Sequence, residues 1–136
     1  MEKLSQGLYD IPMLRPFPAM TIMMPKDAKE AYDLLYTAYE INGPVAIRYP
    51  RGDVFNVVPN YESWQSVPVG SWTTLKSGAD AYLLSMGPIL DDLVQLAEDL
   101  SEAEGINVGV INTRFIKPLD TRLLDELAKL EVPLIV

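Results

Sequence analysis

The sequence contains no cysteine and no histidine. Without cysteine, the chain cannot form disulfides, use a thiol as a nucleophile or bind a metal through thiolates. Without histidine, it lacks the commonest general base, the commonest zinc ligand and one member of the Ser-His-Asp triad. Any chemistry of this chain must therefore use carboxylates, arginine, lysine, tyrosine or the backbone.

Long hydrophobic runs and an excess of basic residues are also missing. No segment approaches the ~20 apolar residues that cross a bilayer, and residues 1–7 contain no signal-peptide core. The chain carries 19 acidic and 11 basic residues, a formal net charge of −8. An acidic surface repels nucleic acid and anionic membranes, although it leaves room for a local cationic pocket for a phosphate. We expect a cytoplasmic globular protein with no nucleic-acid or membrane partner.

Three amphipathic segments predict helices that begin near Asp27, Pro88 and Asp120. Asp27 and Glu30 have the spacing of a capping box at the start of the first helix. The apolar positions follow the helical period and are expected to face a core. They are Ala28, Ala31, Leu34, Leu35, Ala38 and Ile41 in the first helix, Ile89, Leu93, Leu96, Ala97 and Leu100 in the second, and Leu123, Leu124, Leu127 and Leu130 in the third.

Short apolar runs predict buried strands at residues 21–24, 45–47, 81–86, 108–111 and 132–136. Residues 1–20 contain three prolines and are interpreted as an extended loop, whereas residues 53–69 lack periodicity and are interpreted as a linker. Apolar strands that alternate with helices indicate an α/β fold with parallel sheets in a three-layer architecture. The first half supplies only two strands, so we interpret the halves as parts of two larger α/β domains. The alternative is that they share one five-stranded sheet.

Five motifs then occur in order along the chain. Gln-Gly-Leu-Tyr-Asp at residues 6–10 is followed by Leu-Arg, and Met-Pro-Lys-Asp at 24–27 follows a strand. Gly-Pro-Val-Ala-Ile-Arg-Tyr-Pro-Arg-Gly occupies residues 43–52, Val-Pro-Val-Gly-Ser-Trp residues 67–72, and Arg-Phe-Ile-Lys-Pro-Leu-Asp residues 114–120. Together and at this spacing, they resemble the 1-deoxy-D-xylulose-5-phosphate synthases, which are transketolase-like, thiamine-diphosphate-dependent enzymes.

The resemblance runs from about Ser5 onward and implies two partial transketolase-type domains joined by a linker. Residues 1–55 would be the C-terminal part of the pyrimidine-binding domain, residues 56–72 the linker, and residues 73–136 the N-terminal part of the transketolase C-terminal domain. The family's reaction is a transfer that condenses pyruvate with glyceraldehyde 3-phosphate, for isoprenoid and thiamine precursor synthesis. It uses thiamine diphosphate and a magnesium ion.

The chain lacks two features that the family needs for its cofactor. It contains no Gly-Asp-Gly motif to hold the metal and the diphosphate. No glutamate stands in the context of the one that activates the cofactor. We therefore expect no catalytic, cofactor-binding or metal-binding residue in this chain, which would be a fragment that is inactive alone.

Arg51 is the residue for which the resemblance implies a direct role, because the arginine of Tyr-Pro-Arg-Gly contacts the phosphate of the aldehyde substrate. A guanidinium can pair two phosphate oxygens, and Arg51 follows a strand at its carboxyl end, where α/β sheets bind ligands. Ser5 stands where the family has a substrate-contacting histidine, and serine cannot replace an imidazole as an acid or base. Arg48 is expected to be structural, paired with Asp27 or Asp10.

Several other polar and aromatic side chains have structural interpretations. Asp120 is predicted to be a helix N-cap, and Arg114 and Lys117 belong to the same structural segment. Trp64 and Trp72 flank the linker and are expected to anchor it to a domain surface. The acidic residues between Asp91 and Glu104 are interpreted as the solvated face of a helix.

Two other interpretations of the function stay open. The chain could be a natural subunit that completes a site with another chain, or a non-catalytic dimerisation module. Either would belong to a split transketolase or to an enzyme of the 2-oxoacid dehydrogenase beta type. In each case the expected partners are the remainder of the enzyme or a second subunit, and we expect a homo-oligomer such as a dimer.

Overall fold

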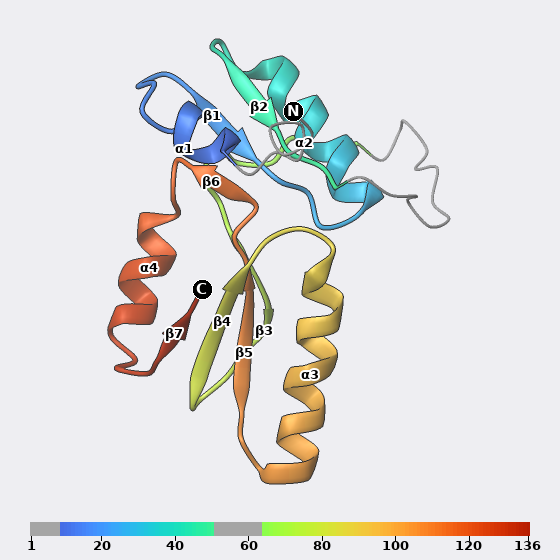
Figure 1. The fold of residues 1–136 in the computed structure, drawn as a ribbon, viewed down its shortest axis with the longest axis vertical. Coiled ribbons are helices and arrows are strands. Elements are labelled where there is room, and N and C mark those ends of the chain that lie inside the picture. The colour runs from blue at the N-terminus through green and yellow to red at the C-terminus, as the bar shows by residue number, and fades with distance from the viewer. Residues whose placement is uncertain (1–8, 51–63) are drawn as a thin grey trace.

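The computed structural model describes residues 9–50 and 64–136, which form two separate sheets. The first sheet has the strand order β2-β1-β6 and the second the order β3-β5-β4-β7 (Figure 1). This arrangement rules out the alternative in which both halves share one five-stranded sheet. In chain order the elements are α1 Asp10–Leu14, β1 Thr21–Met23, α2 Ala28–Glu40, β2 Val45–Ile47, β3 Thr73–Lys76, β4 Ala81–Ser85, α3 Ile89–Glu104, β5 Val108–Asn112, β6 Phe115–Lys117, α4 Thr121–Ala128 and β7 Leu134–Ile135.

The predicted α/β class is confirmed, but the sheets are not purely parallel. Strand β1 pairs in parallel with β2, and β4 pairs in parallel with β5 and β7. Two strands that the sequence did not predict, β3 and β6, run antiparallel to β5 and β1. Strand β6 lies in the second half of the chain but pairs with β1 of the first half. The first sheet is therefore built from both halves.

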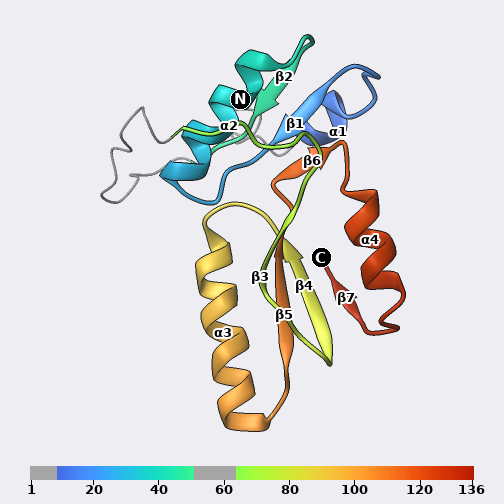
Figure 2. The same cartoon turned by 180° about the vertical axis from the view of Figure 1, so that it is seen from behind.

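The second sheet is the middle of three layers, with α3 on one face and α4 on the other (Figure 2). Successive side chains of a strand point to opposite faces. Val108 and Val110 of β5 accordingly pack under α3, whereas Ile111 packs under α4. The cluster under α3 also contains Leu90 and Ala97. This part of the molecule has the predicted three-layer architecture.

The first sheet buries one further cluster against α2. Its members are Met23, Leu34, Val67 and Phe115, with Trp72 packed against them. Helix α2 begins where the sequence predicts, because the Asp27 carboxylate accepts a hydrogen bond from the Glu30 backbone N–H at 2.8 Å.

Most of the predicted core positions of the helices pack into the three clusters, but several do not. Helix α2 buries Glu30, Leu34 and Thr37, whereas the predicted core residue Leu35 is exposed. Two of the three buried side chains are polar, so apolar periodicity could not identify these two as buried. In α3 the buried residues are Leu90 and Ala97. Three other predicted core residues, Ile89, Leu96 and Leu130, are exposed.

The prediction of an extended loop over residues 1–20 is wrong at residues 10–14. Asp10–Leu14 form the short helix α1, which contains Pro12. Proline is tolerated there because the N–H groups of a helix's first turn have no partner within the helix. None of the residues of α1 is buried.

None of the described helices is both long enough and apolar enough to cross a membrane. The longest, α3, has 16 residues and ends at Gly105, whose φ of 70° lies in the left-handed region that glycine favours. Its acidic residues Asp91, Asp92 and Glu98 are exposed, which confirms the solvated acidic face.

Candidate functional site

The carboxyl ends of the main strands of both sheets meet at the junction between the halves. The backbone N–H of Met24, directly after β1, donates to the Arg114 carbonyl at 2.9 Å. Gly87, which follows β4, lies against the Met24 side chain so closely that a Cβ atom at Gly87 would stand 2.5 Å from Met24 Cε. Since open α/β sheets bind ligands at the carboxyl ends of their strands, we take this junction as the candidate functional site.

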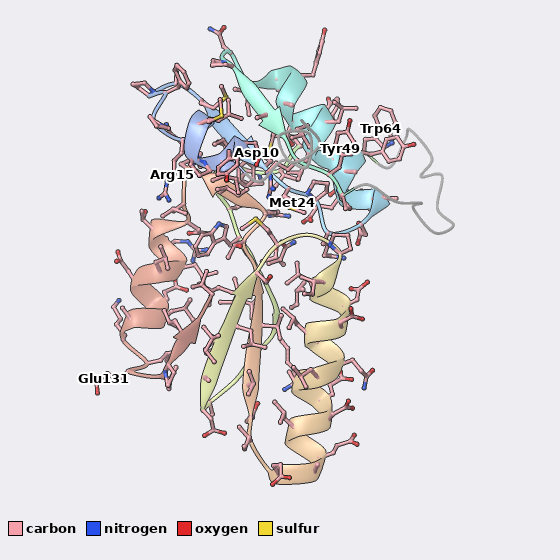
Figure 3. The ribbon with its side chains drawn as sticks, in the orientation of Figure 1. Asp10, Arg15, Met24, Tyr49, Trp64 and Glu131 are labelled. Carbon is pink, nitrogen blue, oxygen red and sulfur yellow. The ribbon has the colours of Figure 1, made fainter. Side chains whose placement is uncertain are left out.

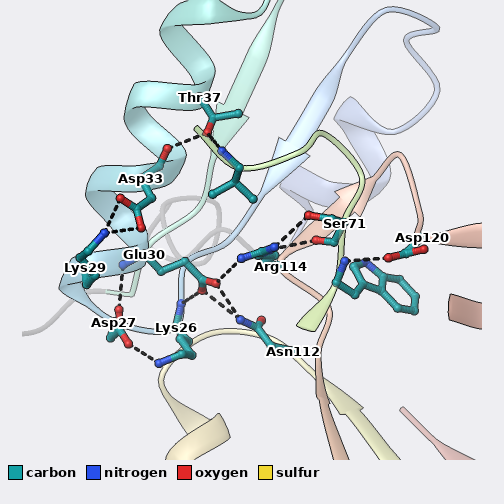
Figure 4. Close-up of polar contacts among 12 residues, drawn as sticks. Lys26, Asp27, Lys29, Glu30, Asp33, Thr37, Ser71, Asn112, Arg114 and Asp120 are labelled. Carbon is teal, nitrogen blue, oxygen red and sulfur yellow. Dashed lines mark hydrogen bonds and ion pairs between the residues drawn. The ribbon is translucent and has the colours of Figure 1, made fainter. Parts of the chain in front are cut away.

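Glu30 is the central side chain of the junction (Figure 4). One of its carboxylate oxygens accepts from the Lys26 backbone N–H at 2.8 Å. The Asn112 amide nitrogen, at the end of β5, donates to both oxygens at 2.9 and 3.0 Å. Arg114 Nη1 approaches the carboxylate at 3.4 Å. Glu30 is 7% exposed and Asn112 is fully buried, so this network links the halves in a dry environment.

Arg114 extends the network toward the linker. Its guanidinium donates to the Ser71 carbonyl at 2.9 Å and to the Ser71 hydroxyl at 2.8 Å. The next residue, Trp72, donates its backbone N–H to Asp120 and its indole N–H to the Phe115 carbonyl. Asp120 also accepts from the Leu123 backbone N–H at 2.9 Å, which confirms it as the N-cap of α4. The structural interpretation of this segment agrees with these contacts.

Lys26 and Asp27 form an ion pair beside Glu30. Burial acts to raise the pKa of Asp27, but the N–H of Glu30 and the ammonium of Lys26 outweigh it and lower this pKa below 3.8. Burial likewise acts to lower the pKa of Lys26. The hydrogen bond to Asp27 and the charges of Asp27, Glu30 and Asp91 raise that pKa above 10.5. Both groups are therefore held in their charged forms.

A second ion pair lies where β2 ends. Arg48 Nε donates to Asp10 Oδ2 at 2.6 Å, which confirms one of the two partners predicted for Arg48. The other predicted partner, Asp27, pairs with Lys26 instead. Burial acts to raise the pKa of Asp10, but the hydrogen bond and the charge of Arg48 lower it below 3.8 overall.

The described end of the linker runs along α2. The Val67 N–H donates to the Thr37 hydroxyl at 2.8 Å, and the Gln65 N–H donates to Asp33 at 3.0 Å. Trp64 stacks on Tyr32, with 5.2 Å between the ring centroids. Together with the contacts of Trp72, this confirms that both tryptophans anchor the linker.

Neither substrate-binding position can be placed relative to this junction. Arg51 and Ser5 both lie outside the described residues, so their predicted roles stay predictions. The nearest described neighbours in sequence are Tyr9 and Pro50, and both are exposed. What the structure does describe is the framework from which both segments leave.

Glu30 and Asn112 are junction residues that the sequence pattern does not reveal. Glu30 was identified only as a member of a capping box, and its side chain would then reach back to the Asp27 N–H. It accepts from Lys26 and Asn112 instead. The position of the Glu30 carboxylate on the same helix face as Leu34 and Thr37 indicates that it is buried. The periodicity does not predict its partner Asn112, which lies 82 residues away in the sequence.

Two family models match the chain. One describes the pyrimidine-binding domain of transketolase and matches residues 4–56, and the other describes the transketolase C-terminal domain and matches residues 70–136. The chain is 47% identical over 135 residues to the 1-deoxy-D-xylulose-5-phosphate synthase of Macrococcus caseolyticus, and 46% identical over 131 residues to that of Listeria monocytogenes serotype 4b. Each alignment covers 96% of this chain but 21% of the relative. The chain thus spans about a fifth of the length of these enzymes.

Two solved structures show the same fold. A split-gene transketolase, described as an inactive beta4 tetramer, superimposes with a TM-score of 0.79 at 28% identity. That match covers 94% of this chain and 51% of the other. A transketolase from Pichia stipitis matches with a TM-score of 0.59 at 21% identity, over 79% of this chain and 16% of the other.

Proposed function

Because this chain belongs to the transketolase family, we propose that it supplies the junction between the pyrimidine-binding and C-terminal domains of a 1-deoxy-D-xylulose-5-phosphate synthase. The observation that carries the proposal is the similarity to such synthases along nearly the whole chain. The complete enzyme would condense pyruvate with glyceraldehyde 3-phosphate on thiamine diphosphate. This chain contributes a rigid framework and one wall of the substrate pocket.

Arg51 is the proposed contact for the phosphate of glyceraldehyde 3-phosphate. It follows β2 by four residues, at the strand end where α/β sheets bind ligands. Its guanidinium can donate two parallel hydrogen bonds to phosphate oxygens. Ser5 takes the place of the family's histidine in this proposal, and its hydroxyl can donate a hydrogen bond but cannot act as an acid or base near neutral pH.

The described residues of this chain do not fit thiamine diphosphate and its metal ion. Among the described residues, no three acidic side chains gather as ligands. The carboxylates of the junction, Asp27 and Glu30, are already paired with Lys26, Asn112 and Arg114. We therefore place the cofactor and magnesium on other polypeptide of the complete enzyme, and no step of the reaction is assigned to this chain through them.

Thermal melts of the purified full chain test the role of Arg51. Inorganic phosphate or glyceraldehyde 3-phosphate is titrated against chloride of equal ionic strength. Bound ligand at ten times its Kd stabilises a protein by about 1.4 kcal/mol, so the melting temperature of the wild type should rise. Arg51→Ala should abolish this rise, whereas Arg122→Ala, which removes an exposed guanidinium on α4, should retain it. An equal response of wild type and Arg51→Ala would refute the proposal.

A second candidate function is favoured by the fold match to the split-gene transketolase. The chain would then be a subunit that assembles with copies of itself and gains activity only with a second kind of subunit. Mass measurement in solution by light scattering distinguishes the two candidates. A defined homo-oligomer favours a natural subunit, whereas a monomer favours a piece of a single-chain synthase.

A further inference from the structure

The outer face of α2 is apolar, whereas its inner face is partly polar. Two of the three side chains that the helix buries are polar, Glu30 and Thr37. On its outer side Leu35, Tyr36 and Tyr39 are exposed by 58%, 39% and 89%. A surface helix normally has the reverse arrangement, with its apolar residues turned inward. Single apolar side chains are ordinary at a protein surface, but a contiguous apolar patch marks an interaction site.

The exposed side chains continue one stripe along α2, which we call the α2 stripe and which consists of Tyr32, Leu35, Tyr36 and Tyr39. Residues three, four and seven positions apart share one face of a helix. Tyr32 is half-buried because Trp64 stacks on its ring, and Figure 3 shows Trp64 beside α2, on the side away from α1. The stripe contains no charged side chain, and tyrosine is one of the residues that contribute most to binding at protein interfaces.

We propose that the α2 stripe is a self-association surface, on which a second copy of this chain docks its own α2 in the antiparallel orientation. A two-fold interface uses the same patch on both copies, so the patch must complement itself. The α2 stripe does so because its spacing is symmetric about the midpoint between Leu35 and Tyr36. In an antiparallel pair, Tyr32 meets Tyr39 of the second copy, and Leu35 meets Tyr36 of the second copy.

The charges around the α2 stripe favour this orientation. Lys29, which pairs with Asp33 in its own helix, lies before the stripe, and the exposed Glu40 lies after it. Antiparallel helices bring each lysine near the glutamate of the other copy, whereas parallel helices align like charges. Helix macrodipoles also attract each other when the helices run antiparallel. Because each copy has a net charge of −8, a contact through uncharged side chains keeps the repulsion between copies low.

The contact is small, so the expected dimer is weak. The 13 residues of α2 form a helix about 20 Å long, and two such helices bury less than the ~1,200 Å² of a stable interface. We expect a dissociation constant of about 10–100 µM, measured by sedimentation velocity of the purified full chain across this concentration range. Leu35→Gln should weaken the dimer at least about fivefold. Leu96→Gln, the same change at a position on α3 that is also exposed, should match the wild type.

Single cysteines test the antiparallel register, because the chain contains no cysteine of its own. Along the axis of the proposed pair, the two copies of Leu35 lie within about 2 Å of each other, whereas the two copies of Tyr39 lie about 10 Å apart. Oxidation should therefore link Leu35→Cys into covalent dimers much faster than Tyr39→Cys, since a disulfide needs its two Cα atoms close together. Leu96→Cys measures the background of random collisions.

Three results would overturn the inference. In the first, the wild type stays monomeric up to about 100 µM, which would leave the α2 stripe to a contact with other polypeptide of the enzyme. In the second, Leu35→Gln leaves an oligomer intact, which would place the contact on another face. In the third, Leu35→Cys and Tyr39→Cys crosslink equally fast. The inference does not use Arg51, so the phosphate titration tests the proposed function separately.

Discussion

Replacing Glu30 by glutamine removes the charge at the centre of the junction while keeping the volume of the side chain. The glutamine oxygen can still accept one hydrogen bond, but its amide group is a donor. That donor would face either the Asn112 amide or the Arg114 guanidinium, which are donors too. The substitution therefore leaves at least one buried donor without an acceptor.

The cost can be estimated from the burial of the partners. Breaking a fully buried ion pair costs about 3–5 kcal/mol, and leaving a buried polar group unsatisfied costs about 1–3 kcal/mol. The Arg114 side chain is 16% exposed and retains Ser71 as an acceptor, which reduces the loss. We expect Glu30→Gln to lower the free energy of unfolding by about 2–3 kcal/mol, which is about 5–10 °C in melting temperature for a chain of this length.

Urea unfolding followed by tryptophan fluorescence and circular dichroism measures this loss. Trp64 reports on α2 through its stacking on Tyr32, and Trp72 reports on the junction. The control is Glu126→Gln, which removes the same charge from an exposed ion pair. It should change the free energy of unfolding by less than about 0.5 kcal/mol. If Glu30→Gln costs no more than this control, the network does not stabilise the junction.

Two further predictions concern the backbone near the junction and the acidic side chains around it. Gly87→Ala should destabilise the protein more than Gly105→Ala. Both glycines have a positive φ, which costs an alanine about 1–2 kcal/mol, but only the new Cβ at Gly87 would also collide with Met24. Equal losses of unfolding free energy in urea would contradict this contact. The lowered pKa values of Asp10 and Asp27 predict a contribution to stability that is complete above about pH 4 and is lost as the pH falls through the values in the folded protein, below 3.8. Asp10→Asn should therefore be less acid-sensitive than the wild type in melts between neutral pH and pH 3, and an unchanged acid dependence would show that the pair adds nothing.

Helices α2, α3 and α4 were predictable because their ends carry local signals. Asp27 and Asp120 cap α2 and α4 through their own side chains, and Gly105 ends α3 in the left-handed conformation. These signals act within one helical turn, so the interacting residues are neighbours in the sequence and can be recognised from it. The polar residues that the helices bury were less predictable. Glu30 and Thr37 are buried where they form hydrogen bonds, and hydrophobicity does not indicate this.

Strands β3 and β6 escaped prediction for a different reason. Thr73–Lys76 and Phe115–Lys117 are short and end in a charged residue, so their sequences do not stand out from loops. Each becomes a strand by pairing with a partner far away in the chain, β5 and β1 respectively. The propensity of a strand depends strongly on such context. The same limit applies to the site. The sequence indicates two possible carboxylate partners for Arg48, Asp10 and Asp27, but it does not decide between them.

The first sheet shows why the halves depend on each other. Two of the four residues in its buried cluster, Val67 and Phe115, come from beyond residue 55, where the sequence pattern of the first half ends. Trp72 packs against this cluster and also against the cluster under α4. The Glu30 network adds a polar connection at the same place, and it is weakened if either side moves away. Two strands with one helix bury too little apolar surface to be stable alone. The first half therefore keeps its structure because β6 and the linker complete its core. The sequence pattern changes where the chain passes from one sheet to the other, but this change does not separate units that fold independently.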